Sequence, residues 1–259
     1  MHELPLLIFT LFLQGSVGVT LWLAFGSGNS SPRSVMFAAA GAFVLASLGL
    51  LASALHMGYP LNALNALRHV SSSWLSREII FASLYLAALG LAVLLLFADK
   101  PGWRLLLVGA GIIGLVDVFC MAQIYMHASV VTWQHLNTLV LFMGSVGIVG
   151  SACMAASAKN YRAAVAIVVL LVLVRLLMQP VWLADIYAAD SSVVTFPHTP
   201  LLMLEQLRAV HLLSWCVSVL GMLCFAVGGL KSARGTMLIG SALLIVGELM
   251  LRFVFFSIG

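Results

Sequence analysis

The sequence predicts an all-α membrane protein, a bundle of eight transmembrane helices in a single integral-membrane domain over residues 1–259. Of its residues, 63% are hydrophobic and only 8% are charged, whereas soluble domains average about 25% charged residues. Eight apolar stretches have about the 20 residues that a helix needs to cross roughly 30 Å of hydrocarbon. Each stretch is continuous, whereas the strands of a membrane barrel alternate apolar and polar residues.

The eight predicted helices follow one another with short connections. They lie near residues 4–26, 35–57, 78–98, 103–126, 136–158, 161–186, 205–229 and 235–256. The first run is long and lacks the positively charged start of a signal peptide, so we interpret it as a helix. Ser76 precedes the third helix and can cap its free N–H groups, and Pro180 should kink the sixth helix.

The basic residues follow the predicted topology, so the formal net charge of +4 does not indicate a nucleic-acid partner. Alternate loops, beginning with the loop after the first helix, contain seven of them: Arg33, Lys100, Arg104, Lys159, Arg162, Lys231 and Arg234. The opposite loops contain only Arg68 and Arg77. Because cytoplasmic loops are enriched in Lys and Arg, we expect a multi-pass protein of the bacterial inner membrane with both termini in the periplasm.

The cysteine pattern indicates neither a metal site nor a disulfide framework. The four cysteines lie inside predicted helices and form no C-x-x-C motif: Cys120, Cys153, Cys216 and Cys224. Free cysteine is among the most buried residue types, so we interpret them as buried small residues and expect no metal in this protein.

Polar residues within the predicted helices gather at mid-depth or on the outer side, and the inner half is apolar. The strongly polar ones are His56, Arg77, Glu78, Asp117, Gln123, Arg175, Gln179, Asp185, Glu205, Arg208, His211, Glu248 and Arg252. A charge at mid-bilayer costs roughly 2.5–3.5 kcal/mol on insertion scales. Such residues are therefore expected to be paired or to face a cavity.

Local spacing predicts two structural ion pairs. Glu248 and Arg252 stand at i, i+4, and Glu205 and Arg208 stand at i, i+3, so each pair can meet on one helix face. Arg175 has no acid within a turn and needs a partner from another helix. Asp117 lies at a similar predicted depth, which predicts that the fourth and sixth helices are neighbours.

His56 and Glu78 flank the loop between the second and third helices, at the outer membrane boundary. Histidine titrates near neutrality, and the two residues together could handle protons. Oxidation of a lipid-soluble hydroquinone needs a hydrogen-bond acceptor on its hydroxyl and a second group that passes the proton to water.

Three segments resemble one known family: HELPLLIFTLFLQG at the start, ALHMGYPLNALNALRHVSSSWLSREI in the middle, and GELMLRFVFF near the end. The protein resembles the membrane-anchor subunits of anaerobic dimethyl sulfoxide reductase complexes. The resemblance implies an anchor in a heterotrimer with an iron–sulfur subunit carrying [4Fe-4S] clusters and a molybdopterin catalytic subunit. It also implies menaquinol oxidation in anaerobic respiration, without haem in the anchor itself.

The resemblance assigns quinol binding to the histidine of its L-H-x-G-x-P stretch and the glutamate of its L-S-x-E-I stretch. In this sequence they are His56 and Glu78, the two residues already selected by topology. Secondary candidates for quinol contact, semiquinone stabilisation or partner docking are Arg68, His69, Arg77, Gln123, Arg175 and His211.

Two other functional classes fit the sequence less well. A haem b anchor needs histidines that face one another across helices; His56 and His211 could do so near the outer face, but the inner half has no histidine. A transporter or proton channel would need polar groups through the inner half as well.

Overall fold

The computed structural model describes residues 4–26, 31–56, 67–155, 161–190 and 200–258. Within these ranges the regular structure is helical, with no strand. Eight helices are long and apolar enough to cross a membrane, which confirms the predicted fold class. They are α1 (Leu4–Gly26), α2 (Pro32–His56), α4 (Trp74–Phe97), α5 (Trp103–Met126), α6 (Leu136–Met154), α7 (Tyr161–Asp190), α9 (Arg208–Leu230) and α10 (Arg234–Ile258).

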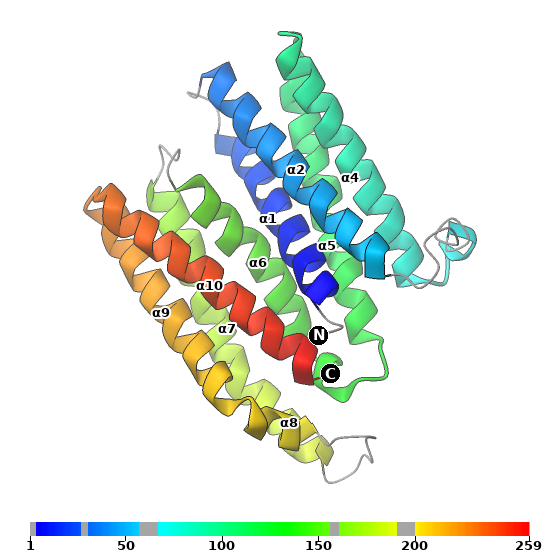
Figure 1. Ribbon diagram of the computed structural model, residues 1–259, viewed down its shortest axis with the longest axis vertical. Helices are drawn as coiled ribbons and strands as arrows, with labels where there is room; N and C mark the ends of the chain where they lie inside the picture. The colour runs from blue at the N-terminus through cyan, green and yellow to red at the C-terminus, as the bar shows by residue number, and fades with distance from the viewer. Residues whose placement is uncertain (1–3, 27–30, 57–66, 156–160, 191–199, 259) are drawn as a thin grey trace.

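Three short elements lie between these helices: the 3-10 turns η3 (Leu67–His69) and η4 (Val131–Trp133), and the helix α8 (Pro200–Gln206). Successive long helices run up and down the bundle, so α1 begins and α10 ends at the same end (Figure 1). We call this the termini end. It also contains the end of α2, the start of α4 and the short elements η3, η4 and α8.

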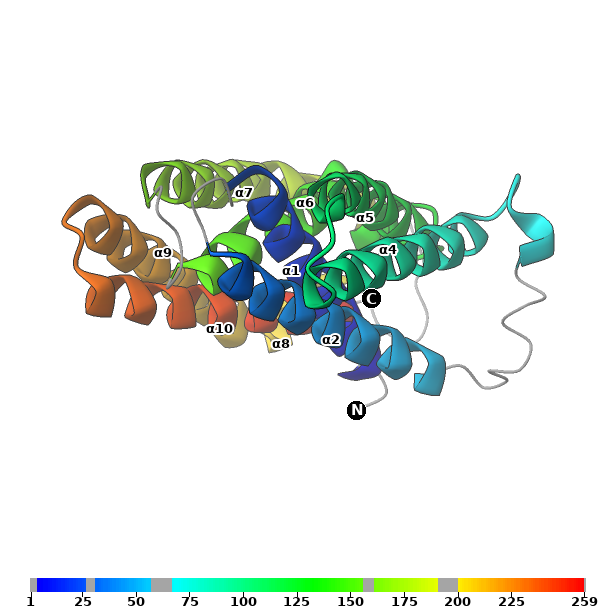
Figure 2. The ribbon, with the colours of Figure 1, turned by 90° about the horizontal axis from the view of Figure 1, so that it is seen from above.

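The first helix, α1, lies in the interior of the bundle (Figure 2). It packs against α2, α5, α6 and α10, and 72% of its most apolar window is buried, against 28% for α2, α7 and α9. Its buried hydroxyl groups are paired: the Tyr85 hydroxyl lies 2.6 Å from Ser16 Oγ and 3.0 Å from Thr20 Oγ1.

Helices α1 and α6 cross with their backbones in close approach at Gly18 and Gly150. A Cβ atom on Gly18 would lie 2.1 Å from the carbonyl oxygen of Val146, and one on Gly150 would lie 2.6 Å from the Gly18 backbone. Small residues at such crossings allow membrane helices to pack closely.

Replacing Gly18 with Val is therefore expected to lower the thermal unfolding temperature of the purified protein in detergent. The added side chain meets backbone, which cannot rotate away, and overpacking typically costs about 1–3 kcal/mol. Gly109→Ala is the matched control, because a Cβ there meets nothing within 4 Å. Equal stability of the two variants would contradict the close α1–α6 crossing.

The third long helix begins earlier than predicted. Ser73, rather than Ser76, is the N-cap of α4 and accepts a hydrogen bond from the Ser76 N–H at 3.4 Å. The prediction placed its start near residue 78. Helix α4 begins at Trp74, about one turn before Glu78. Ser76 and Glu78 are both buried within its first turns.

Candidate functional site

Glu78 and Asp117 form an acid pair between α4 and α5. Both side chains are buried, with 5% and 0% of their surfaces exposed, and the two carboxyl groups are close enough to interact electrostatically. The interface exists because α4 and α5 are antiparallel neighbours packed along their length. Neither oxygen of Asp117 has a hydrogen-bond partner among the described residues.

Arg77 is adjacent to Glu78 in sequence but is directed elsewhere. Its guanidinium donates hydrogen bonds to the carbonyl oxygens of Val70, at 2.9 Å, and Ser71, at 2.6 Å. It also lies over the Trp74 ring, 4.3 Å from the centroid. Arg77 therefore orders the segment that leads into α4.

The predicted ion pair between Asp117 and Arg175 is wrong. Arg175 forms its ion pair with Glu248 of α10, and both side chains are about 3% exposed. The predicted contact between the fourth and sixth long helices, α5 and α7, is also wrong, because α6 packs against both of them. Depth alone suggested Asp117, but the bundle turns its carboxyl towards α4.

Arg175 and Glu248 belong to a larger buried group, which we call the arginine cluster. It consists of Gln14, Ser145, Arg175, Glu248 and Arg252, from α1, α6, α7 and α10. Ser145 Oγ donates a hydrogen bond to Glu248 Oε2 at 2.6 Å and accepts one from Arg175 at 2.9 Å. With two arginines and one glutamate, the cluster contains one more cationic than anionic side chain.

Arg252 does not form the predicted ion pair with Glu248 on the same helix. Its Nη2 donates to Gln14 Oε1 at 2.7 Å and to Ser145 Oγ at 2.9 Å. The guanidinium lies over the Phe142 ring, 4.0 Å from the centroid. Glu248 and Arg252, both buried, each form hydrogen bonds with groups from other helices rather than with the i, i+4 neighbour.

The predicted pair of Glu205 and Arg208 is also wrong. Both residues are exposed, and within the described ranges the ion pairs are Arg175–Glu248 and His135–Asp185. The regular helix is interrupted at Leu207, since α8 ends at Gln206 and α9 begins at Arg208. The i, i+3 geometry of one continuous helix is therefore lost.

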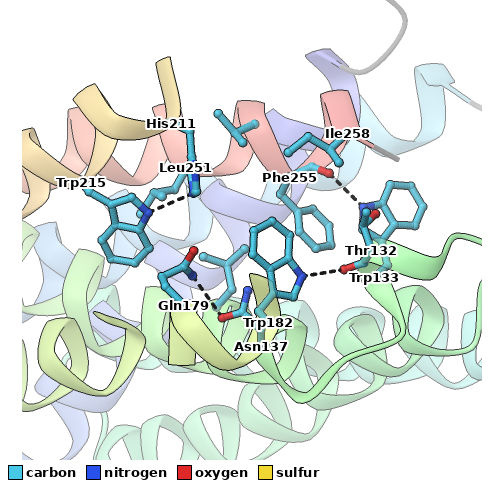
Figure 3. A pocket seen from close by; sticks show the side chains of 12 residues that line it. Thr132, Trp133, Asn137, Gln179, Trp182, His211, Trp215, Leu251, Phe255 and Ile258 are labelled. Atoms are coloured by element: carbon cyan, nitrogen blue, oxygen red, sulfur yellow. Dashed lines mark hydrogen bonds between the residues drawn. The ribbon is translucent and has the colours of Figure 1, made fainter. Parts of the chain in front are cut away.

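A separate pocket lies at the termini end among α6, α7, α9, α10 and η4 (Figure 3). It is lined by Thr132, Trp133, Asn137, Leu141, Gln179, Trp182, His211, Trp215, Leu251, Val254, Phe255 and Ile258. The indole N–H of Trp215 donates to His211 Nε2 at 3.0 Å, and that of Trp182 donates to the Thr132 carbonyl oxygen at 3.0 Å.

This pocket suits water better than a quinone ring. Its volume is about 30 Å³, whereas one water needs roughly 10–15 Å³. Thr132 Oγ1 and Gln179 Oε1 are buried and have no hydrogen-bond partner among the described residues, so each requires a water molecule.

The remaining predicted site residues lie at the termini end or near it. Arg68 and His69 are exposed on η3, and Gln123 is partly buried on α5, with Nε2 4.0 Å from Met126 Sδ. His56 is the last residue of α2, but its side chain lies outside the described part of the structure. The structure thus brings Asp117, rather than Arg175 or His211, to Glu78.

Sequence reasoning missed Gln14 and Ser145, which hold Arg252 and link α1 and α6 to α10. Gln14 is the one amide side chain in the otherwise apolar or small first helix, and that contrast could have identified it. Ser145 gave no signal, because serines in membrane helices commonly bond to their own backbone.

An eight-span bundle with its buried ionisable groups between helices defines an integral-membrane protein. The protein belongs to the family described as DMSO reductase anchor subunit (DmsC), whose model matches residues 1–258.

Individual relatives are similar over part of their length. The C subunit of the anaerobic dimethyl sulfoxide reductase of Escherichia coli (strain K12) is 36% identical over 157 residues, 55% of this protein and 55% of the relative. The subunit of the same name from Haemophilus influenzae is 31% identical over 153 residues, 53% of this protein and 52% of the relative. The matched region thus spans about half the length of these relatives. No solved structure matches the protein.

Proposed function

We propose that this protein binds and oxidises menaquinol in the bacterial inner membrane and passes the electrons to an iron–sulfur subunit. In this proposal the iron–sulfur subunit serves a molybdopterin catalytic subunit, and the three form a heterotrimer. Membership of the anchor-subunit family supports a membrane role in such a complex. The curated relatives are named as parts of anaerobic dimethyl sulfoxide reductases.

The observation that carries the proposal is the burial of Glu78 in the second turn of α4. Helix α2 ends at His56 and packs against α4, so two proton-binding residues flank one interface at the termini end. A buried acid so close to the start of a membrane span is costly, which is the expected signature of a functional group rather than a solvated surface charge.

The chemistry requires two proton acceptors. A hydroquinone becomes a quinone when both O–H bonds break and two electrons leave, so two protons must be taken up. His56 accepts one proton and Glu78 accepts the other, and both pass to water at the termini end. The electrons leave in two steps to the iron–sulfur subunit, for which the exposed Arg68 and His69 offer a basic docking surface.

The termini end is assigned to the periplasm in this proposal because seven of nine loop basic residues belong to the opposite loops. Protons and electrons then leave on the same side. Turnover should therefore move no net charge across the membrane.

His56→Ala tests the function. The assembled complex carrying it is expected to lose reduction driven by a menaquinol analogue and to keep activity driven by an artificial dye, which donates electrons directly to the partner subunits. Assembly is checked by co-purification of the three subunits. Full quinol-driven turnover in this variant and in the corresponding Glu78 variant would contradict the proposed quinol site.

A further inference from the structure

Two of the buried acids in this bundle lie apart from the buried arginines, whereas a third, Glu248, is ion-paired with Arg175. Two carboxyl groups, those of Glu78 and Asp117, lie between α4 and α5, whereas Arg175 and Arg252 belong to the arginine cluster. Coulomb repulsion and the loss of hydration both oppose two negative charges at one dry interface. An acid pair of this kind is expected to hold one proton.

Two polar side chains near the acid pair, Tyr85 and Arg77, already form hydrogen bonds with other groups. Tyr85, which also interacts electrostatically with Asp117, has its hydroxyl committed to Ser16 and Thr20. Arg77 is bonded to backbone carbonyls before α4. Cys120, one turn after Asp117 on α5, lies close enough to Arg77 and both acids to interact with them.

Asp117 lies deeper than Glu78. Its carboxyl group is next to the backbone of Ala82, four residues after Glu78 along α4, which corresponds to about 6 Å at the helical rise of about 1.5 Å per residue. Asp117 is therefore placed behind Glu78, further from the termini end.

We propose that Asp117 is the proton partner of Glu78: the two buried carboxyl groups together hold one proton at rest, and the pair takes up and releases one quinol proton in each turnover. This inference rests on the proposed function. Asp117 does not touch the quinol; it acts through Glu78.

Each turnover leaves the acid pair as it began. When the quinol O–H bond beside Glu78 breaks, its proton joins the Glu78 carboxylate and its electron goes to the iron–sulfur subunit. The pair then holds two protons and is neutral, which suits a buried site. One proton leaves from Glu78 to water at the termini end, which restores the pair with one proton.

Asp117→Asn in the assembled complex tests the proposal, because Asn keeps the size of the side chain but cannot exchange a proton. We expect kcat of quinol-driven turnover to fall by about 10-fold or more. The loss should not exceed the 10²- to 10⁴-fold that a direct acid–base group contributes. KM and dye-driven activity should stay unchanged. Asp117→Glu should recover part of the loss. Ser83→Ala, an exposed position on the same helix as Glu78, should have no effect.

An infrared difference spectrum between the complex during quinol turnover and the resting oxidised complex separates proton exchange from a structural role, because the pair holds a second proton only during turnover. The wild-type spectrum should contain the carbonyl band of a protonated carboxylic acid, and both Asp117→Asn and Glu78→Gln should remove it. Absence of that band in the wild type overturns the proposal whether or not the variants fold. Unchanged kcat in Asp117→Asn alone also overturns it, whereas unchanged turnover in Glu78→Gln and His56→Ala as well would remove the proposed function itself.

Discussion

Replacing Glu78 with Gln is expected to lower menaquinol-dependent turnover of the assembled complex by about 10²- to 10⁴-fold, the range that a positioned acid–base group contributes. Gln preserves the size and much of the hydrogen bonding of the side chain but cannot accept a proton. Since Glu78 is buried, neighbouring water cannot readily replace it. Turnover is measured with a menaquinol analogue as donor, and dye-driven reduction is measured in the same preparation.

Two further variants show whether the loss of turnover is specific to the carboxyl group of Glu78. Glu78→Asp retains the carboxyl group on a shorter side chain and should keep more activity than Glu78→Gln. Glu205→Gln removes an exposed carboxyl group on α8 and should leave both activities unchanged. If Glu78→Gln and Glu205→Gln behaved alike, Glu78 would be a structural acid and the proton acceptor would have to be sought elsewhere at the termini end.

The fold was predictable because span length and apolar composition are local properties of the sequence. The predicted 4–26 and 103–126 coincide with α1 and α5. The largest error at a helix start was at α4, which begins at Trp74 rather than residue 78. The apolar signal weakens there because buried polar residues occupy the first turns, so the apolar run begins after the helix does.

The partners of the buried charges were not predictable in the same way. Arg175 and Glu248 are 73 residues apart, and which of several acids faces an arginine depends on helix rotation and packing order. The rule for i, i+4 pairs describes exposed helix faces, and it selected Arg252 for Glu248. In a dry interior the arginine is better satisfied by several groups from different helices, and Gln14 and Ser145 supply them.

That buried pairing leads to the largest expected effect on stability. Arg175→Leu removes the arginine that forms the ion pair with Glu248 and leaves Arg252 as the cation of the cluster, and Glu248→Leu leaves Arg175 and Arg252 together without an anion. Removing one member of a buried ion pair typically costs about 3–5 kcal/mol. Each single variant is therefore expected to unfold at a clearly lower temperature in detergent, or to fail to assemble, whereas Arg208→Gln, an exposed position on α9, should not.

The double variant Arg175→Leu/Glu248→Leu should be more stable than Glu248→Leu, which leaves two buried arginines without an anion. It removes both charges at once, so no unpaired charge is left from this pair, and apolar replacement of a buried ion pair is often neutral or stabilising. Arg252 then remains as the single charge of the cluster, held by Gln14, Ser145 and the Phe142 ring. Recovery in the double variant relative to Glu248→Leu would mean that this single variant is destabilised by its unpaired cations. If instead the two losses add, the pair itself contributes net stability, and the arginine cluster holds α6, α7 and α10 together rather than merely neutralising its own members.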